Sequence, residues 1–297
     1  MVGTEPSQHP RTPQRPSLPL TTTVSPHEVL DNSRLAPDVH RLEVRAERVA
    51  AAGRPGQFVI VRLGPGAERI PLTIADADVD RGAISLVVQA VGKSTRDLVA
   101  LRPGERIEDV AGPLGRPSTL VTDGHAVCVA GGVGAAVVYP IARGLRHSGA
   151  TVTTMLGVRS RDRVLLAPEL AAQGRVVVCT EDGSEGRHGL VTDALADALR
   201  DGAAVVYAAG PVPMMQAVAE LTRPLRIRTI VSLNPIMVDG TGMCGGCRVT
   251  VGGRMRFACV DGPEFDAHEV DFDELADRLT TYRPFERAAL QSTEVGP

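Results

Sequence analysis

The sequence predicts three folded units in series: a β-barrel, a doubly wound α/β domain and a small cysteine-containing domain. Residues 28–121 contain short alternating segments separated by Pro-Gly and Asp-rich turns, which is the pattern of a small barrel. Residues 122–228 alternate apolar runs with helical stretches, which predicts a parallel sheet covered by helices. Residues 229–297 hold a glycine-rich loop with paired cysteines. Residues 1–27, rich in Pro, Ser, Thr and Gln, are expected to form a disordered tail.

Two segments of the barrel have the residue types of a ligand site. The barrel strands are expected over His40–Val44, Gln57–Leu63, Ile70–Ala75 and Ala83–Val91. The segment Arg69–Thr73, R-I-P-L-T, places a proline and a hydroxyl side chain at a strand start. The segment Val91–Thr95, V-G-K-S-T, opens a short helix, whose first N–H groups would hold a pyrophosphate. The same string is also typical of an ordinary turn and helix cap, so this segment alone leaves the ligand open.

The α/β domain is expected to bind its ligand at the carboxyl ends of its strands. Strands are expected over Ala126–Ala130, Thr151–Gly157, Val176–Thr180 and Ala204–Ala208, and helices over Val137–Arg146, Leu190–Leu199 and Pro213–Leu221. The run Val127–Ala136, V-C-V-A-G-G-V-G-A-A, is a strand, a glycine turn and a helix start, which lets a dinucleotide pyrophosphate approach the backbone. A close strand-to-helix turn needs glycines in any case. The segments Thr180–Ser184 and Ala209–Met215 follow two other strands, where ligands bind in open α/β sheets.

The segment Asp239–Cys247, D-G-T-G-M-C-G-G-C, together with Cys259 offers three thiols and a carboxylate as metal ligands. Paired thiolates of a C-x2-C sequence can wrap one side of a small iron–sulfur cluster, while the glycines let backbone N–H groups point at the sulfides. A carboxylate keeps the negative charge of a thiolate but is a harder donor. The sequence therefore predicts a [2Fe-2S] centre held by Asp239, Cys244, Cys247 and Cys259, with a potential altered by the carboxylate.

Two other uses of the cysteines stay open at this point. The three thiolates and a carboxylate could hold zinc, although structural zinc sites usually have two close cysteine pairs or a Cys/His mixture, and this loop contains no His. A disulfide is disfavoured because the cysteines number five and no secretory signal is evident. Cys128 and Cys179 lie in apolar runs and are expected to be core thiols. A short strand pair around Cys247–Cys259 and a helix over Asp273–Leu279 complete the C-terminal unit.

Charge and hydropathy exclude several classes of partner. The formal net charge of −3 gives no indication of nucleic-acid binding or of an anionic membrane surface. No apolar run approaches the roughly 18 residues that span a bilayer. The sequence therefore predicts a soluble, cytoplasmic protein with neither nucleic acid nor membrane as a partner.

Taken in order, these segments resemble the ferredoxin-NADP+ reductase superfamily. Within it, the chain resembles the FAD and [2Fe-2S] electron-transfer subunits related to that of dihydroorotate dehydrogenase. It is most similar to the small (alpha) subunits of NADH-dependent ferredoxin:NADP+ oxidoreductase, also called sulfide dehydrogenase small subunits. The matching stretches are Pro55–Leu63, Glu68–Asp76, Ser232–Val249 and Phe257–Asp266. The resemblance covers residues 31–282 and implies a ferredoxin-reductase-like FAD barrel, an NAD-binding α/β domain and a [2Fe-2S] domain.

The resemblance also implies roles for individual residues. FAD would be bound by Arg69, Pro71, Leu72 and Thr73 at the flavin ring, and by Gly92, Ser94 and Thr95 at the pyrophosphate. NAD(H) would be bound by the turn of Gly131, Gly132 and Gly134, with Asp182, Gly183, Gly210 and Pro211 near the nicotinamide. Asp239 stands where the dihydroorotate relatives have their first cluster cysteine.

The function that follows is an NAD(P)H-dependent oxidoreductase subunit. Its electrons would pass between NAD(H), FAD and the cluster, to or from a larger FAD/iron–sulfur flavoprotein subunit, and through that subunit to ferredoxin. A hydride carries two electrons and the cluster accepts one, so the flavin stands between them, and no catalytic acid or base is required. The first alternative is the electron-transfer subunit of dihydroorotate dehydrogenase, which Asp239 argues against. The alternative of another class is a zinc-stabilised nucleotide-binding regulatory protein.

The segment Val158–Arg161, V-R-S-R, bears on the choice of nicotinamide. It follows the second expected strand of the α/β domain, where an arginine can meet the 2′-phosphate of NADP. A solvated basic loop explains the same residues, and the resemblance favours NAD(H). NADH is therefore the expected nucleotide.

Overall fold

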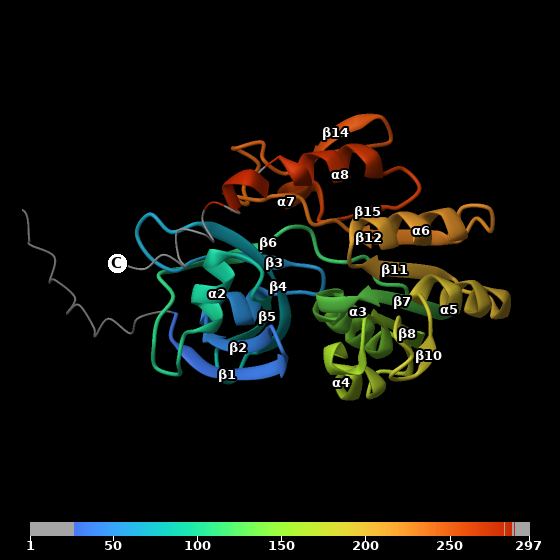
Figure 1. Cartoon of the computed structure of the whole chain (residues 1–297), viewed down its shortest axis with the longest axis horizontal. Helices are drawn as coiled ribbons and strands as arrows, with labels where there is room; N and C mark the ends of the chain where they lie inside the picture. Colours follow the sequence, from blue (N-terminus) through green and yellow to red (C-terminus); the bar gives the residue numbers. More distant parts are fainter. Residues whose placement is uncertain (1–26, 282, 287, 289–297) are drawn as a thin grey trace, which may run out of the picture.

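The computed structural model describes residues 27–281, 283–286 and 288 of the 297-residue chain. Figure 1 shows the barrel beside the α/β unit, with the cysteine-containing unit lying across the top of both. This is the predicted fold class, a β-barrel followed by an α/β unit and a small C-terminal unit. The tail expected over residues 1–27 lies outside the described residues except for His27. None of the described helices has the length and apolar composition needed to cross a membrane.

The barrel is a six-stranded antiparallel sheet in the order β1-β2-β5-β4-β3-β6. Its strands are β1 (Val29–Ala36), β2 (Val39–Arg45), β3 (Phe58–Arg62), β4 (Arg69–Asp78), β5 (Ala83–Gln89) and β6 (Asp109–Leu114), with the short helices α1 (Glu47–Ala52) and α2 (Lys93–Val99). The start of β1 bonds to the segment before β6, from Val29 N to Glu105 O at 2.8 Å and from Ile107 N to His27 O at 2.9 Å. These bonds join the two edges of the sheet. Alternate side chains such as Leu42, Ile84 and Leu86 are buried inside.

The α/β unit is a mainly parallel sheet in the order β10-β9-β8-β7-β11-β12-β15. Its parallel strands are β7 (His125–Gly131), β8 (Thr151–Val158), β9 (Arg175–Thr180), β10 (Arg187–His188), β11 (Val205–Ala209) and β12 (Arg228–Ser232). Helices α3 (Ala135–His147) and α4 (Ala167–Ala171) pack on one face, and α5 (Val191–Ala198) and α6 (Val212–Thr222) pack on the other. Because both faces are covered, the central strands β7 and β11 are mainly apolar and buried. Cys128 and Cys179 are buried in this core as predicted.

The C-terminal unit is fused to the sheet rather than separate from it. Strand β15 (Glu264–Asp266) pairs antiparallel with β12, with Ser232 opposite Glu264. The rest of the unit is the cysteine loop, a hairpin of β13 (Arg248–Val251) and β14 (Arg254–Phe257), and helices α7 (Ala258–Asp261) and α8 (Phe272–Thr280). The expected boundary at residues 228/229 therefore falls at the start of β12.

The linker between β6 and β7 runs through the junction of the three units. Ser118 N donates to the Pro55 carbonyl oxygen of the barrel at 2.8 Å, and Ser118 Oγ donates to Glu264 Oε1 of β15 at 2.6 Å. Arg116 N donates to the Gly262 carbonyl oxygen at 2.6 Å. Burial in this junction raises the pKa of Glu264 to about 7, although the Ser118 hydroxyl acts in the opposite direction.

The raised pKa of Glu264 predicts a pH-dependent stability. The folded chain binds this proton more tightly than the unfolded chain, so the stabilisation is complete at pH 4 and is lost as pH rises through 7. Glu264→Gln keeps an acceptor for Ser118 and removes the charge. At pH 8 we expect this variant to be more stable than the parent by about 1–2 kcal/mol, discounted for partial solvent exposure. Chemical denaturation at pH 5 and pH 8 would measure this, and an equal difference at both values would contradict it.

Candidate nucleotide and cluster site

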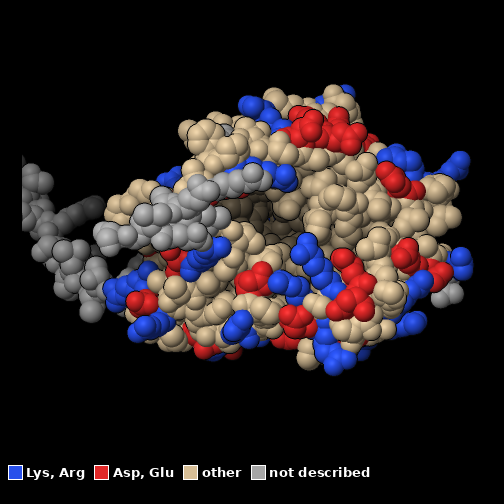
Figure 2. All heavy atoms as spheres, viewed as in Figure 1, with Lys and Arg blue, Asp and Glu red and all other residues tan. Residues whose placement is uncertain are grey.

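A cavity of about 680 Å³ opens where the three units meet, and Figure 2 shows this face of the molecule hollowed there. The barrel contributes β3 and β4, the α/β unit contributes the carboxyl ends of β7, β8, β9 and β11, and the segment between β12 and the cysteine loop closes one side. Its lining includes Phe58, Pro71, Thr73, Gly131, Gly132, Gly134, Val158, Glu181, Gly210, Pro211, Ser232, Leu233, Asn234, Pro235 and Met237. A cavity of this size and position suits a bound cofactor.

The floor of the cavity is built by two glycine turns in contact. A Cβ on Gly134 would lie 2.0 Å from the Ala209 carbonyl oxygen, so only glycine lets the turn after β7 approach the end of β11. A Cβ on Gly210 would lie 3.0 Å from the Gly131 backbone. Strand order runs outward from β7 to β8 on one side and from β11 to β12 on the other, so the turns mark the switch point of the sheet.

The cavity gathers part of the predicted nucleotide and flavin residues. Those lining it are Pro71, Thr73, Gly131, Gly132, Gly134, Gly210 and Pro211, whereas Arg69, Leu72, Gly92, Ser94, Thr95, Asp182 and Gly183 are not among its lining residues. Sheet order explains the position of Asp182 and Gly183. They follow β9, which is three strands from β11, or about 14 Å at ~4.8 Å per strand. The structure therefore does not bring them together with Gly210 and Pro211.

The start of α2 has the geometry of a capped helix. Gly92 N donates to Thr95 Oγ1 at 2.9 Å, and the same hydroxyl donates to the Gly92 carbonyl oxygen at 3.0 Å. Ser94 Oγ donates to Glu68 Oε2 at 2.5 Å. A Cβ on Gly92 would have Thr95 Oγ1, at 4.0 Å, as its nearest neighbour, so the space in front of this turn is open. The Thr95 hydroxyl thus caps the helix, the Ser94 hydroxyl is bound to Glu68, and the space beside the Gly92 backbone is open.

The cysteine loop brings two thiols into contact, and the other two predicted ligands, Cys244 and Asp239, belong to the same loop. Cys247 Sγ and Cys259 Sγ are 3.2 Å apart, and both residues are buried. Cys244 is exposed, and its Sγ accepts a hydrogen bond from Gly246 N at 3.4 Å. The Asp239 carboxylate accepts from Thr241 N at 2.9 Å and from Cys244 N at 2.8 Å. In the described part of the chain, no three His, Cys, Asp or Glu side chains already converge on one metal position.

The chemistry of these donors fits an iron–sulfur cluster. Backbone hydrogen bonds, above all from Thr241, lower the pKa of Asp239, so its side chain is ionised. Burial, with the neighbouring Cys247, raises the pKa of Cys259 to about 12, so the Cys259 thiol becomes a thiolate only beside a strong positive charge such as a metal. Gly240, Gly242 and Gly245 have φ of 76°, 85° and 67°, which lets the loop turn sharply around a bound group.

Sequence reasoning missed several residues of the cavity wall. Asn234 and Met237, in the segment between β12 and the cysteine loop, line the cavity, and so does Asp38 from the turn between β1 and β2. Asn234 and Met237 lie in the stretch Ser232–Val249, which carries the family resemblance, so the resemblance could have identified them. Nothing in the local sequence around Asp38 marks it, because its position depends on how the barrel packs against the α/β unit.

Two protein-family models match the chain. Residues 234–271 match the iron–sulfur cluster binding domain of dihydroorotate dehydrogenase B. Residues 128–220 match the oxidoreductase NAD-binding domain. The first match covers the whole cysteine loop and favours an iron–sulfur cluster over the zinc alternative. The second covers both glycine turns.

Relatives match over most of the chain. A dihydroorotate dehydrogenase B (NAD(+)) electron transfer subunit homolog from Thermotoga maritima is 44% identical over 266 residues, which cover 89% of this chain and 94% of the relative. The electron transfer subunit of dihydroorotate dehydrogenase B from Geobacillus thermodenitrificans is 34% identical over 253 residues, covering 82% and 96%.

Solved structures extend the comparison to the fold. A chain from the NADH-dependent reduced ferredoxin-NADP oxidoreductase structure, a study of flavin-based electron bifurcation, is 43% identical, with a TM-score of 0.86 over 91% of this chain and 98% of that chain. The Amycolatopsis cytochrome P450 reductase GcoB is 24% identical, with a TM-score of 0.59 over 68% and 66%, and shows a shared fold.

The family models, relatives and fold together confirm the predicted cofactors, which are FAD, an iron–sulfur cluster and NAD(H). The chain is accordingly an NAD(P)H-dependent oxidoreductase subunit. It belongs to the family of dihydroorotate dehydrogenase B-type electron transfer subunits, which also includes a subunit of NADH-dependent reduced ferredoxin-NADP oxidoreductase.

Proposed function

We propose that this chain is the NADH-binding subunit of a ferredoxin:NADP+ oxidoreductase-type complex, exchanging electrons with a larger FAD/iron–sulfur flavoprotein subunit. The observation that carries the proposal is the shared cavity. It joins the glycine turns of the α/β unit, strand β4 of the barrel, and the segment between β12 and the cysteine loop. Bound FAD would supply the step between a two-electron and a one-electron carrier.

The chain's own residues would orient the two cofactors. Pro71 and Thr73 would hold the flavin ring, with Arg69 and Leu72 beside it on β4. Gly92, Ser94 and Thr95 would lie along the FAD pyrophosphate. The dinucleotide would cross the sheet with its nicotinamide at Gly210 and Pro211, its pyrophosphate at Gly131, Gly132 and Gly134, and its adenosine at the ends of β8 and β9. Sheet order gives this path its length, because β11 and β9 lie three strands apart in the sheet. Asp182 and Gly183 would then lie beyond the adenosine ribose.

The cluster would be held by Asp239, Cys244, Cys247 and Cys259. Ser232–Pro235 and Met237 line the cavity just before Asp239, so this segment supports a short path between flavin and cluster. Cys244 would turn its exposed thiol toward the buried pair when the metal binds.

The reaction of the assembled complex distinguishes the proposed ferredoxin:NADP+ oxidoreductase from a dihydroorotate dehydrogenase. The complex, isolated with its larger subunit, should reduce NADP+ with electrons from NADH and reduced ferredoxin, and should not reduce orotate. Orotate-dependent oxidation of NADH would instead favour the dihydroorotate alternative. Asp239 supports the first outcome, because the dihydroorotate relatives are expected to have cysteine there.

NADH should reduce the bound flavin faster than NADPH. The carboxylate of Glu181 lies at the cavity wall near the adenosine end, where it would repel a 2′-phosphate. We expect a preference of about tenfold, since one unfavourable charge contact costs ~1–2 kcal/mol. Stopped-flow bleaching of the flavin with each nucleotide measures this. A preference for NADPH that disappears in Arg159→Ala or Arg161→Ala would contradict it.

The exposed apolar side chains around the cysteine loop support a docking face for the larger subunit. Met243 is 88% exposed, Val238 46% and Val260 38%, and all three lie within two residues of a proposed cluster ligand. Exposed apolar groups gathered in one place are typical of protein interfaces. A partner bound here would cover Cys244 and exclude water from the cluster.

Met243→Glu should weaken the complex with the larger subunit at least tenfold, because a charge would be buried without a partner. The iron content should be unchanged, since Met243 is not a proposed ligand. Met255→Glu is the matched control: Met255 is 61% exposed, but it lies on the β14 hairpin. Analytical ultracentrifugation or surface plasmon resonance would measure the affinity. Equal effects of the two substitutions would contradict the assignment of this face.

A further inference from the structure

The loop after β8 carries three arginines at alternate positions, Arg159, Arg161 and Arg163. In the nucleotide site proposed above, this loop lies at the adenosine end of the cavity. A guanidinium group binds phosphate through two parallel hydrogen bonds, so each of the three could take the 2′-phosphate that distinguishes NADP(H) from NAD(H). Which nucleotide is accepted depends on what already holds these side chains.

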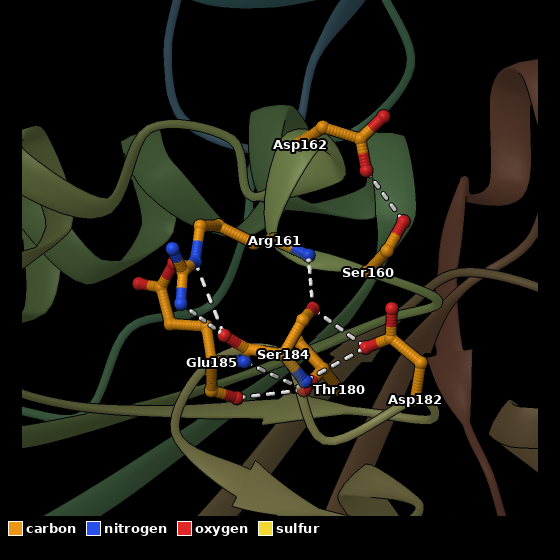
Figure 3. A network of polar contacts seen from close by, with 7 residues as sticks. All are labelled: Ser160, Arg161, Asp162, Thr180, Asp182, Ser184 and Glu185. Atoms are coloured by element: carbon orange, nitrogen blue, oxygen red, sulfur yellow. Dashed lines mark hydrogen bonds and ion pairs between the residues drawn. The ribbon is translucent and has the colours of Figure 1, made fainter.

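Arg161 is held by the loop that follows β9, as Figure 3 shows. Its Nε and one terminal nitrogen donate to the Ser184 carbonyl oxygen at 3.1 and 2.5 Å, and its backbone N–H donates to Ser184 Oγ at 2.8 Å. The Glu185 carboxylate lies 3.6 Å from Arg161 Nε. Ser184 is fixed in turn, because its N–H and hydroxyl donate to Asp182 at 2.9 and 2.6 Å. Arg161 is not among the residues that line the cavity.

Arg163 lines the cavity but is paired across the boundary between two units. Its guanidinium donates to Asp38 Oδ1, in the turn between β1 and β2, at 2.8 Å. Asp38 also accepts a hydrogen bond from Gln89 Nε2 at 2.8 Å. The hydrogen bond from Gln89 and the charge of Arg163 lower the pKa of Asp38, so the carboxylate is ionised at neutral pH.

Arg159 differs from the other two. It lines the cavity, and within the described residues no hydrogen bond or ion pair holds its side chain. Glu181 follows the neighbouring strand and lines the same cavity. An arginine and a carboxylate together leave this end without excess positive charge, whereas a 2′-phosphate needs two or more donors free to reach it.

We propose that Asp38 and the Ser184–Glu185 segment determine nucleotide specificity by holding Arg163 and Arg161 away from a 2′-phosphate, so that the cavity takes NAD(H) rather than NADP(H). Asp38 acts through its hydrogen bond with Arg163, and Glu185 acts through the ion pair that adds to the Ser184 contacts of Arg161, so both carboxylates are positioning residues. The inference rests on the nucleotide site proposed above and adds two carboxylates that act through the arginines beside them.

The test compares two probes that differ by one phosphate. The Kd values of 5′-ADP and 2′,5′-ADP would be measured calorimetrically on the flavin-loaded protein and on the double variant Asp38→Asn/Glu185→Gln. We expect the double variant to bind 2′,5′-ADP about tenfold more tightly, the value of one charge-assisted contact, with the Kd of 5′-ADP within about twofold. Adding Arg161→Ala to the double variant should reverse most of the gain.

The control is Asp162→Asn on the same loop. Asp162 accepts a hydrogen bond from Ser160 at 2.5 Å, and no ion pair of the described residues joins it to an arginine. In Asp162→Asn, the ratio of the Kd of 5′-ADP to that of 2′,5′-ADP should equal the ratio in the parent. An unchanged ratio in the double variant, or an equal shift in Asp162→Asn, would overturn the inference. If NADH still bleaches the flavin in that case, the proposed nucleotide site would stand. Failure of the parent to bind either probe or to react with NADH would overturn the proposed nucleotide site and the inference together.

Discussion

Cys247→Ser is expected to abolish the iron–sulfur cluster while flavin stays bound. Cys247 lies 3.2 Å from Cys259 in the buried half of the loop, and a serine hydroxyl is a much weaker donor to iron than a thiolate. The parent should contain about two irons and two sulfides per chain, the stoichiometry of a [2Fe-2S] centre. Iron and sulfide analysis with the visible spectrum would show their loss, while FAD released by denaturation should remain near one per chain.

Three further variants make this result specific. Cys244→Ser should lose the cluster as well, and Asp239→Cys should keep a cluster of shifted potential, because the donor becomes softer. Cys128→Ala is the control, since this buried thiol lies in β7, outside the loop, and its iron content should match the parent. Zinc in place of iron in the parent, or full iron in Cys247→Ser, would remove these residues from the site.

Gly92→Glu should expel the flavin. The space in front of Gly92 is open, its nearest neighbour to an added Cβ lies 4.0 Å away, and its backbone is extended with φ of −125°. A side chain therefore causes no strain in the protein itself, and a glutamate would project its charge into the proposed pyrophosphate site. We expect flavin affinity to fall at least a hundredfold, about 3 kcal/mol, for a direct clash with repulsion between like charges.

Gly92→Ala tests whether a loss of flavin in Gly92→Glu comes from a clash with FAD or from damage to the fold. Its methyl group has room, so the variant should keep most of its flavin and serves as the matched control. Iron content should survive in both variants, because the cluster loop belongs to another unit. Full retention of FAD by Gly92→Glu would show that the pyrophosphate lies elsewhere.

The strands and helices with clear periodicity were predictable from the sequence. The strand expected over Ala126–Ala130 is observed as β7, and the helix expected over Val137–Arg146 is observed as α3, two residues longer at its start. Strand β1 was not among the expected strands, because its residues V-L-D-N-S-R-L-A include four polar side chains. It lies at one end of the strand order, and its half-buried Asn32 bonds to the Val99 and Leu101 carbonyl oxygens at 2.9 and 2.6 Å, so the alternation of apolar and polar residues is weak.

Long-range contacts were the part that the sequence could not supply. The linear order places Asp182 and Gly210 alike, each just after a strand, and only the strand order separates them across the sheet. The hydrogen bond from Ser118 to Glu264 joins residues 146 positions apart. Neither the separation of Asp182 from Gly210 nor the Ser118–Glu264 hydrogen bond has a local sequence signal, because both depend on how strands and units pack. The proposed cluster ligands, in contrast, lie close in the sequence, so spacing and residue type sufficed to nominate them.

The pairing of β15 with β12 has a consequence for how the chain is made. Until residues 264–266 emerge from the ribosome, β12 is an open edge with unpaired N–H and C=O groups, which is the kind of surface on which sheets aggregate. The strand that protects this edge belongs to the unit carrying the cluster loop. Delayed folding of the C-terminal unit would therefore expose the nucleotide-binding unit to aggregation. Its yield in cells thus depends on a segment about forty residues downstream of its own last helix.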